Sequence, residues 1–581
     1  MYRYVFAGPI TPNSVEHSYD FLMKTFMAWL LVFACSPAAI AQQQVQDKPV
    51  PRSQPRPSAT TVAQWQDRKF GMFIHFGLYS QLGGMWQGQK IDNGYSEQIM
   101  ANAPIPLSEY AATAKTFNPT KWDPDAVVAL AKAAGMKYIV ITSKHHDGFN
   151  MFHTSQTKYN IVDATPYHRD IVKELADACK RGGIGFGVYY SSIDWHEPGM
   201  DHYIEGNGNP LSDAHARFNA AQLQELMSNY GPISEIWFDM GNPTPEQSNL
   251  FATTVHKLQP QTMVSGRVWN YQGDFTVMGD NEVPEYGIDE PWQTPASIFN
   301  ETWGYRSWQE RDNLQCKIQE NILRLVQVVS RGGNYILNIG PEGDGSIVPY
   351  EAEVLRGIGA WLKPNGEAIY GTKASPFPAL GFGYATMKND TIYLFVKTIP
   401  PDGVLRLPHA GHTAWGTAEV LASGRALKIN RDENSASVQV PVGSLEGTLP
   451  VIKLTFRGEV VIDKPLPIYD AGPIVLDEKS AEKFYSYNGR GYESPKTLYK
   501  MRWAVRTGCA SMTFHTNGEG EVALVSNGSS RRVMLKDGST EEIVIGGDET
   551  LEITPPEPFL KGTPLPLKIQ AIDLSPQPCP R

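Results

Sequence analysis

The sequence predicts an α/β protein in which a (β/α)8-type, TIM-like barrel is followed by C-terminal antiparallel β-sandwich modules. Between residues 62 and 372, short runs of β-branched and aromatic residues alternate with amphipathic segments, a pattern typical of βα units. After residue 372 the segments become short and alternating, with Gly, Pro and Asn between them, which favours antiparallel strands. The length of 581 residues also exceeds one ordinary domain.

The barrel region contains six predicted strands, and a predicted helix precedes most of them. The strands are expected at 71–77 (GMFIHFG), 138–144 (YIVITSK), 184–191 (IGFGVYYS), 235–240 (EIWFDM), 263–268 (MVSGRV) and 334–339 (NYILNI). The helices are expected at 124–134, 170–181, 213–230, 245–258 and about 311–330. An open doubly wound sheet gives a similar pattern, but no G-x-G-x-x-G opens a helix, which argues against dinucleotide binding.

The region after the barrel is predicted to form two β-sandwiches. The first spans residues 373–462, with strand-like segments such as 391–397 (TIYLFVK) and 451–456. The motif DKPLP then opens the second, residues 463–581, with strand-like segments such as 521–526. For this last module, a carbohydrate-binding role and a purely structural role are both open.

The N-terminus has the features of an export signal. Lys24 precedes the apolar run 25–35 (TFMAWLLVFAC), and small residues follow up to Ala41. We expect residues 1–41 to be a signal peptide cleaved after Ala41, which implies a periplasmic or secreted protein. The apolar run is too short for an integral membrane span. A lipoprotein anchored at Cys35 is the less favoured reading, since Phe33 fits that motif poorly.

Residues 42–61 are rich in Pro and Gln and are predicted to be a flexible leader.

Composition excludes some classes of partner. A formal net charge of −10 argues against nucleic-acid binding, because no excess of basic residues is present to neutralise phosphates. The cysteines and histidines show no zinc-binding spacing, so no metal site is predicted. The oligomeric state, including a homo-oligomer, is left open.

Polar residues lie inside, at the end of or directly after four of the predicted strands, and the catalytic groups of a barrel cluster at the strand ends. They are His75, His145 and His146, Asp194-Trp195-His196, and Asp239. Neighbouring imidazoles in an extended chain point to opposite faces, so hydrogen bonding to a polyhydroxylated ligand suits them better than a shared metal. A carboxylate that ends the apolar run EIWFD needs partners or a substrate. The residues alone leave both an active-site cluster and scattered structural roles open.

A series of motifs carries a specific resemblance. GMFIHFG, KHHDGF (144–149), RDIV (169–172), GVYYSSIDW (187–195), EIWFDM and SRGGNYILNIGPEGDG (330–345) occur in this order. The series resembles the α-L-fucosidases of glycoside hydrolase family 29 over residues 65–372, and more weakly beyond.

The resemblance implies a retaining glycosidase that removes terminal α-L-fucosyl residues from fucosylated glycans through a covalent fucosyl-enzyme. Such enzymes use two carboxyl groups about 5–5.5 Å apart. In this family the Asp of the W-x-D motif is the nucleophile, which here is Asp239. No metal or organic cofactor is implied. The sugar-binding positions expected from the resemblance and the strand ends are His75, Glu97, His145, His146, Tyr189, Trp195, Trp237 and Arg267.

The acid/base is not fixed in sequence across the family. This chain offers Asp280, Glu282, Glu285 and Glu301. We prefer Glu282, because residues 274–284 resemble the loop that bears this group in several relatives, and Glu301 is the second choice. The sequence also departs from the family's pattern at Gln98 and Gln293, where many relatives have Trp and Glu.

Two alternatives remain at this stage. One is a retaining glycosidase for a related sugar, since a barrel with two carboxylates supports many glycosides. The other is a non-catalytic carbohydrate-binding barrel. The presence of Asp239 disfavours the second alternative, and the absence of any carboxylate within its reach would favour it.

Overall fold

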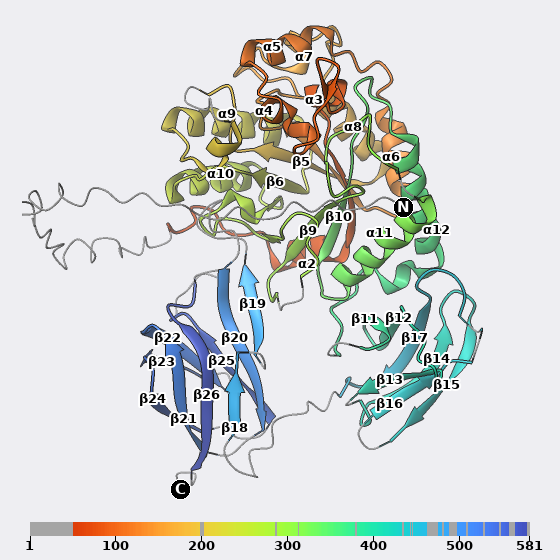
Figure 1. The fold of residues 1–581 in the computed structure, drawn as a ribbon, viewed down its shortest axis with the longest axis vertical. Coiled ribbons are helices and arrows are strands. Elements are labelled where there is room, and N and C mark those ends of the chain that lie inside the picture. Colours follow the sequence, from red (N-terminus) through yellow and green to blue (C-terminus); the bar gives the residue numbers. More distant parts are fainter. Residues whose placement is uncertain are drawn as a thin grey trace, which may run out of the picture. The chain divides into compact units, whose positions relative to one another are not determined.

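The computed structural model describes most of the chain after residue 49 (Figure 1). The described residues are 50–197, 203–284, 288–311, 313–377, 380–408, 410–432, 435–441, 443, 445–461, 474–478, 481–486, 497–506, 509–526, 529–544, 548–556 and 564–577. The expected signal peptide, residues 1–41, and the start of the expected leader lie outside them. In the described part of that leader, Arg52 forms an ion pair with Asp274 at 2.8 Å, which holds this part against the next domain.

Eight parallel strands form the central sheet of residues 50–372. They are β1 (Phe70–Ile74), β4 (Tyr138–Lys144), β5 (Gly185–Ser191), β6 (Glu235–Asp239), β7 (Met263–Val264), β8 (Thr276–Val277), β9 (Trp292–Ser297) and β10 (Asn334–Ile339). Their order is β7-β6-β5-β4-β1-β10-β9-β8, and a parallel bridge between Ser265 and Phe275 joins the two outer strands. The sheet therefore curls round on itself, and the predicted barrel is confirmed.

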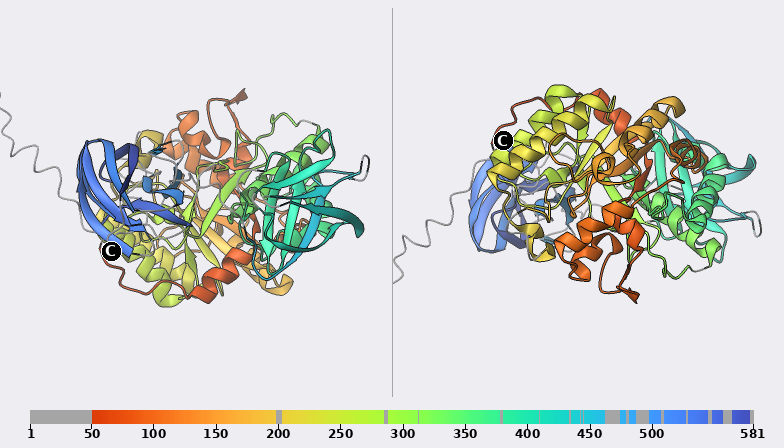
Figure 2. Two further views of the ribbon diagram at one scale, coloured as in Figure 1. Left: turned by 90° about the horizontal axis from the view of Figure 1, so that it is seen from below. Right: turned by 90° about the horizontal axis from the view of Figure 1, so that it is seen from above.

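Helices lie outside these strands (Figures 1 and 2). The longer ones are α2 (Ala59–Asp67), α6 (Pro124–Ala133), α8 (Ile171–Gly182), α9 (Asp213–Asn229), α10 (Pro245–Leu258), α11 (Leu314–Val329) and α12 (Pro349–Asn365). Short helices, α3 (Leu78–Leu82), α4 (Ile99–Asn102), α5 (Leu107–Ala112) and α7 (Ile161–Ala164), occupy the loops after β1 and β4. Polar side chains cap the first turns, as when Asp170 accepts a hydrogen bond from the Lys173 amide at 2.8 Å.

Strand alternation divides the barrel into an interior and an outer core. Trp237 lies in the interior cluster with Phe73 and Tyr189. Its neighbours Ile236 and Phe238 belong instead to the larger core between strands and helices. The side chain of Asp239 follows the inward series, so β6 delivers it to the carboxyl end of the barrel.

All six predicted strands and all five predicted helices of the barrel are present, with small shifts at their ends. The predicted strand 263–268 stops at Val264, because the 3₁₀ turn Gly266–Val268 follows it. Strands β8 and β9 and helix α12 were not among the predicted elements. β8 has two residues, too few for a period, and β9 contains Pro295 among polar residues.

An antiparallel sheet follows the barrel. Its strands are β11 (Gly383–Lys388), β12 (Thr391–Val396), β13 (Val404–Pro408), β14 (Ala414–Val420), β15 (Arg425–Arg431), β16 (Ser435–Gln439) and β17 (Val451–Arg457), in the order β11-β12-β17-β14-β15-β16-β13. Tyr393, Phe395 and Val451 pack into the outer core of the barrel. Trp361 of α12 also donates a hydrogen bond to the Thr448 carbonyl at 2.8 Å.

Two further antiparallel sheets form the last module. One contains β18 (Ile474–Asp477), β26 (Lys568–Gln577), β21 (Cys509–Asn517) and β24 (Ser539–Val544), in that order. The other contains β19 (Glu482–Ser486), β20 (Thr497–Arg506), β25 (Asp548–Thr554), β22 (Gly520–Ser526) and β23 (Ser529–Leu535). They share one hydrophobic core, which includes Trp503 and Met512. A carbohydrate-binding role for this module stays a prediction.

Within the described residues, no helix has both the length and the apolar character needed to cross a bilayer. The same part of the chain holds no group of three or more His, Cys, Asp or Glu side chains arranged to bind a metal ion.

Candidate active site

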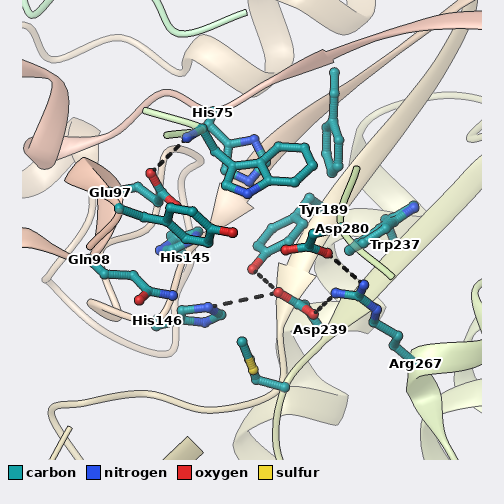
Figure 3. Close-up of a pocket in the computed structure, with 14 residues that line it drawn as sticks. His75, Glu97, Gln98, His145, His146, Tyr189, Trp237, Asp239, Arg267 and Asp280 are labelled. Carbon is teal, nitrogen blue, oxygen red and sulfur yellow. Dashed lines mark hydrogen bonds and ion pairs between the residues drawn. The ribbon is translucent and has the colours of Figure 1, made fainter. Parts of the chain in front are cut away.

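A pocket opens at the carboxyl end of the barrel strands (Figure 3). The space inside it, open mouth included, is about 360 Å³. Its lining comes from the ends of several strands and the loops after them: Phe73, His75, Tyr95, Glu97, Gln98, His145, His146, Tyr189, Trp237, Asp239, Met240, Arg267, Asp280 and Trp303.

Asp239 is buried and has charged and polar partners on both carboxylate oxygens (Figure 3). The Tyr189 hydroxyl donates to Oδ2 at 2.8 Å, and Nη1 of Arg267 donates to Oδ1 at 2.8 Å. Nε2 of His146 lies 3.8 Å from Oδ2. Burial alone would raise the pKa of Asp239, but Arg267, then His146 and the hydrogen bonds, outweigh it and hold that pKa below its usual value. The carboxylate is therefore ionised at neutral pH.

Arg267 joins a second carboxylate to the first. Its Nη2 donates to Oδ1 of Asp280 at 2.7 Å and to the Met278 carbonyl at 3.1 Å. The guanidinium also lies over the Trp237 ring, 4.9 Å from its centroid. Since Asp239 and Asp280 contact the same guanidinium group, both face one space in the pocket. The Asp280 side chain is 34% exposed, whereas that of Asp239 is 9% exposed, so Asp280 lies at the mouth.

Three histidines form one wall and are held neutral. Nδ1 of His75 hydrogen-bonds with Oδ1 of Asn338 at 2.7 Å, and Nδ1 of His146 with the Ser191 hydroxyl at 2.8 Å. Burial lowers the pKa of His75 and of His146 to about 4, and that of His145 well below its usual value. Nδ1 of His145 is buried without a hydrogen-bond partner among the described residues, so a ligand hydroxyl would satisfy it.

Glu97 is a third carboxyl group on the pocket, deeper than the other two. It is 2% exposed, and its Oε2 accepts hydrogen bonds from the backbone amides of Trp303 at 3.1 Å and Gly304 at 2.8 Å. Burial raises the pKa of Glu97 to about 7, although these hydrogen bonds oppose the shift. A substantial protonated fraction at neutral pH would allow this group to donate to a sugar hydroxyl as well as accept from one.

The structure brings together most of the residues singled out from sequence. His75, Glu97, His145, His146, Tyr189, Trp237, Asp239 and Arg267 all line the pocket, and so does the acid/base candidate Asp280. Trp195 lies behind the wall instead, packed against His146 with ring centroids 5.6 Å apart, and its indole N–H donates to Oδ1 of Asn207 at 3.0 Å.

Two preferred acid/base candidates do not line the pocket. Oε2 of Glu282 accepts from the Gly279 amide at 2.9 Å, which turns its carboxylate back onto its own loop. Glu301 is exposed, and its backbone carbonyl accepts from Arg306 at 2.8 Å. Glu285 lies outside the described residues. Catalytic roles for these three residues stay predictions.

Five lining residues were not predicted: Phe73, Tyr95, Gln98, Met240 and Trp303. Phe73 lies two residues before His75 on the same strand, so alternation carried a signal for it. Tyr95 and Gln98 are close to Glu97 in the chain. Trp303 and Met240 carried no such signal.

The fold and the pocket define a class of protein. Two carboxylates are held by one arginine at the carboxyl end of a barrel, among imidazole, hydroxyl and aromatic groups suited to a sugar ring, an arrangement typical of a glycoside hydrolase. The model of the α-L-fucosidase family matches residues 37–367. The chain therefore belongs to the α-L-fucosidase family.

Individual relatives agree with this assignment. The tissue α-L-fucosidase of Rattus norvegicus is 33% identical over 420 residues, covering 67% of this chain and 88% of the relative. The plasma α-L-fucosidase of Homo sapiens is 32% identical and covers 66% of this chain and 86% of the relative.

Solved structures of the family share the fold. A family 29 α-L-fucosidase from Bacteroides thetaiotaomicron superposes with a TM-score of 0.63 at 27% identity, over 71% of this chain and 98% of that one. A second structure from the same organism is described as a covalent intermediate trapped with 2-fluoro-fucosyl fluoride. The α-L-fucosidase of Vibrio sp. strain EJY3 has a TM-score of 0.64 at 27% identity and covers 90% of this chain and 99% of that one.

Proposed function

We propose that this chain is a retaining α-L-fucosidase that hydrolyses terminal α-L-fucosyl residues of glycans by double displacement. The observation that supports it most directly is the pair Asp239 and Asp280 held on the single guanidinium of Arg267. A second carboxylate beside Asp239 also disfavours the non-catalytic alternative. The covalent intermediate described for the Bacteroides structure accords with this chemistry.

The nucleophile in this proposal is Asp239. It ends β6, is ionised, and is aimed into the pocket by the hydrogen bonds of Tyr189 and Arg267. One Asp239 oxygen attacks the anomeric carbon, the bond from that carbon to the leaving-group oxygen breaks, and an ester joins the fucosyl unit to the enzyme.

We assign the acid/base to Asp280, in place of Glu282. Asp280 shares the guanidinium of Arg267 with Asp239 and lies at the mouth, where the leaving group departs. In this proposal Asp280 transfers a proton to the leaving oxygen as the bond from that oxygen to the anomeric carbon breaks. Glu97 is a poorer candidate, because it lies deep in the pocket with Oε2 bound to two amides.

Esterification of Asp239 then changes the charge balance. Arg267 is then left facing the Asp280 carboxylate alone. Asp280 removes a proton from water, the water oxygen attacks the anomeric carbon, and the bond to Asp239 breaks. His75, His145, His146 and Glu97 bind the hydroxyls of the sugar, and Phe73, Trp237 and Trp303 provide its apolar surroundings.

The test is hydrolysis of an aryl α-L-fucoside with an activated leaving group by wild type and by the variants Asp280→Ala, Glu282→Ala and Glu301→Ala, with and without azide. We expect azide to restore turnover in Asp280→Ala only, because azide replaces water without needing a base. Rescue of Glu282→Ala instead would return the role to Glu282. A wild type inactive on fucosides but active on another glycoside would overturn the substrate assignment.

Export by the N-terminal signal is a separate part of the proposal. It is supported by Lys24, the apolar run 25–35 and the small residues up to Ala41. N-terminal sequencing of the protein recovered from a bacterial host's periplasm or medium should begin at Gln42. An intact N-terminus in a cytoplasmic fraction would contradict it.

A further inference from the structure

Met240 directly follows strand β6, and its side chain lies on the side of the strand that alternation does not predict. Along β6 the side chains of Trp237 and Asp239 point inward, while Ile236 and Phe238 pack outward. Alternation therefore directs residue 240 away from the pocket. The structure instead places Met240 on the pocket lining, next in sequence to Asp239.

The backbone shows how this side chain is redirected. Met240 has a φ of 56°, and Gly241 follows with a φ of 77°. A left-handed conformation is ordinary for glycine but strained for a methionine, and such strain concentrates at functional sites. In this conformation Met240 lines the pocket. The next residues are fixed by the hydrogen bond from the Gly241 amide to the Asn207 carbonyl at 2.8 Å.

Burial divides the pocket into a floor and a mouth. The residues assigned to the fucosyl unit, such as His75, His146 and Trp237, are at most 6% exposed. Met240 and Gln98 are only partly buried and share the mouth with Asp280. In an enzyme that cleaves terminal residues, the leaving group occupies the mouth beside the acid/base.

We infer that Met240 forms a wall of the leaving-group subsite and that Gln98 contributes a hydrogen-bonding amide to it. The occupant is a pyranose whose C–H face packs on the thioether and whose hydroxyl meets the amide. An unbranched, polarisable side chain adapts to leaving groups of different shape. It therefore suits leaving-group sugars that carry the fucosyl unit on different hydroxyls. This inference rests on the proposed function and adds the recognition of the second sugar.

The test compares two substrates that differ only in the leaving group: α-L-fucosyl fluoride and a fucosyl-hexose disaccharide. Fluoride fills no subsite. We expect Met240→Ala to lower kcat/KM about tenfold for the disaccharide, the effect of a lost apolar contact, and to leave kcat/KM for the fluoride within about twofold. Gln98→Ala should show the same selectivity with a smaller loss.

Two further variants distinguish an effect of the Met240 side chain from an effect of its backbone conformation. Met240→Leu keeps an apolar wall and should retain most disaccharide activity. Met240→Asn tolerates the left-handed backbone but lacks the apolar wall, and should behave like Met240→Ala. Inhibition by free fucose, which fills only the floor, should be unchanged in all four variants.

Equal losses on both substrates would overturn the inference, because Met240 would then act on the fucosyl ring or on Asp239. No loss on either substrate would overturn it as well. A wild type that cleaves neither substrate would overturn the proposed function itself, and the inference with it.

Discussion

Tyr189 connects the aromatic wall of the pocket to Asp239, the proposed nucleophile. Its hydroxyl donates to Asp239, and its ring packs between Trp237 and His145 at centroid distances of 5.7 and 5.5 Å. The hydroxyl therefore provides a hydrogen bond to the carboxylate that the ring alone cannot provide, while the packing of the ring fixes where the hydroxyl points.

Tyr189→Phe should keep the packing and remove this one hydrogen bond. A hydrogen bond to a charged group contributes about 1.5–3 kcal/mol, so kcat on an aryl fucoside should fall roughly tenfold to hundredfold. The thermal midpoint, measured alongside, should change little. An unchanged kcat would show that the tyrosine hydroxyl plays no part in orienting Asp239.

The neutral histidines make the fold sensitive to acid. Burial lowers the pKa of His75 and of His146 to about 4, whereas an unfolded histidine titrates near 6.5. As the pH falls from 6.5 towards 4, the unfolded chain takes up protons that the folded chain does not, so stability is lost over this window. Each residue accounts for about 3 kcal/mol across it.

His146→Gln should therefore weaken the pH dependence. The decrease in thermal midpoint between pH 7 and pH 4 should be smaller in this variant than in wild type. His153→Gln, at a side chain that is 56% exposed, serves as the matched control and should follow wild type. Identical pH dependence in all three proteins would contradict the burial of a neutral His146.

Sequence alone singled out most of the residues that line the pocket, because strand ends with polar residues are recognisable and the motifs are ordered. It left the acid/base open, since six carboxyl groups occur between residues 280 and 301 and only the fold shows that Asp280 contacts Arg267 beside Asp239. Met240 could not have been predicted, because strand alternation points the other way.

Among the secondary-structure elements, two glycines at and before β5 show which contacts set the positions of the strands. Gly183 ends α8 with a φ of 64°, and a Cβ there would meet nothing within 4 Å. Gly187 lies inside β5, where a Cβ would come within 2.7 Å of the Glu235 carbonyl oxygen in β6. The first glycine serves a helix end, and the second allows close approach of two strands that carry the site.

Gly183→Ala should cost about 1 kcal/mol of stability and leave kcat unchanged. Gly187→Ala should cost more and also lower kcat, because β5 and β6 carry Tyr189 and Asp239. Thermal unfolding and kinetics of the two variants, measured in parallel, check both statements. Equal effects of the two substitutions would mean that β5 and β6 can move apart to accommodate a Cβ at residue 187, which would contradict the close contact.

The repeated alternation of strands and helices predicted the barrel, since long periodic segments are readable locally. Strands β8 and β9 were missed, because their pairing depends on neighbours brought together by the whole barrel. The barrel closes through a single bridge at Ser265 and Phe275, a long-range contact without a local pattern.

At the scale of the whole molecule, the two C-terminal modules relate differently to the barrel core. The first shares that core through Tyr393, Phe395 and Val451, whereas the last module has a core of its own. A salt bridge between Lys453 and Glu367, 2.8 Å long, adds to the first contact.

A chain that ends at residue 461 should therefore fold and keep its fucosidase activity. A chain that ends at residue 372 should be insoluble or unfolded, because it exposes the apolar surface of α12 and its neighbours. Circular dichroism, solubility and activity of the two truncated proteins check this. An active protein ending at residue 372 would contradict the shared core.

We propose that Asp239 forms a covalent fucosyl ester, and mass spectrometry after treatment with 2-fluoro-fucosyl fluoride detects such an ester. The 2-fluoro substituent slows both formation and breakdown of the ester, and the good fluoride leaving group offsets the slow formation, so the ester accumulates. We expect one 2-fluoro-fucosyl unit per chain, located on Asp239 in the peptide that contains EIWFDM, and none on Asp239→Asn. A label on another carboxylate, or an active enzyme that acquires no label and releases inverted fucose, would contradict the claim.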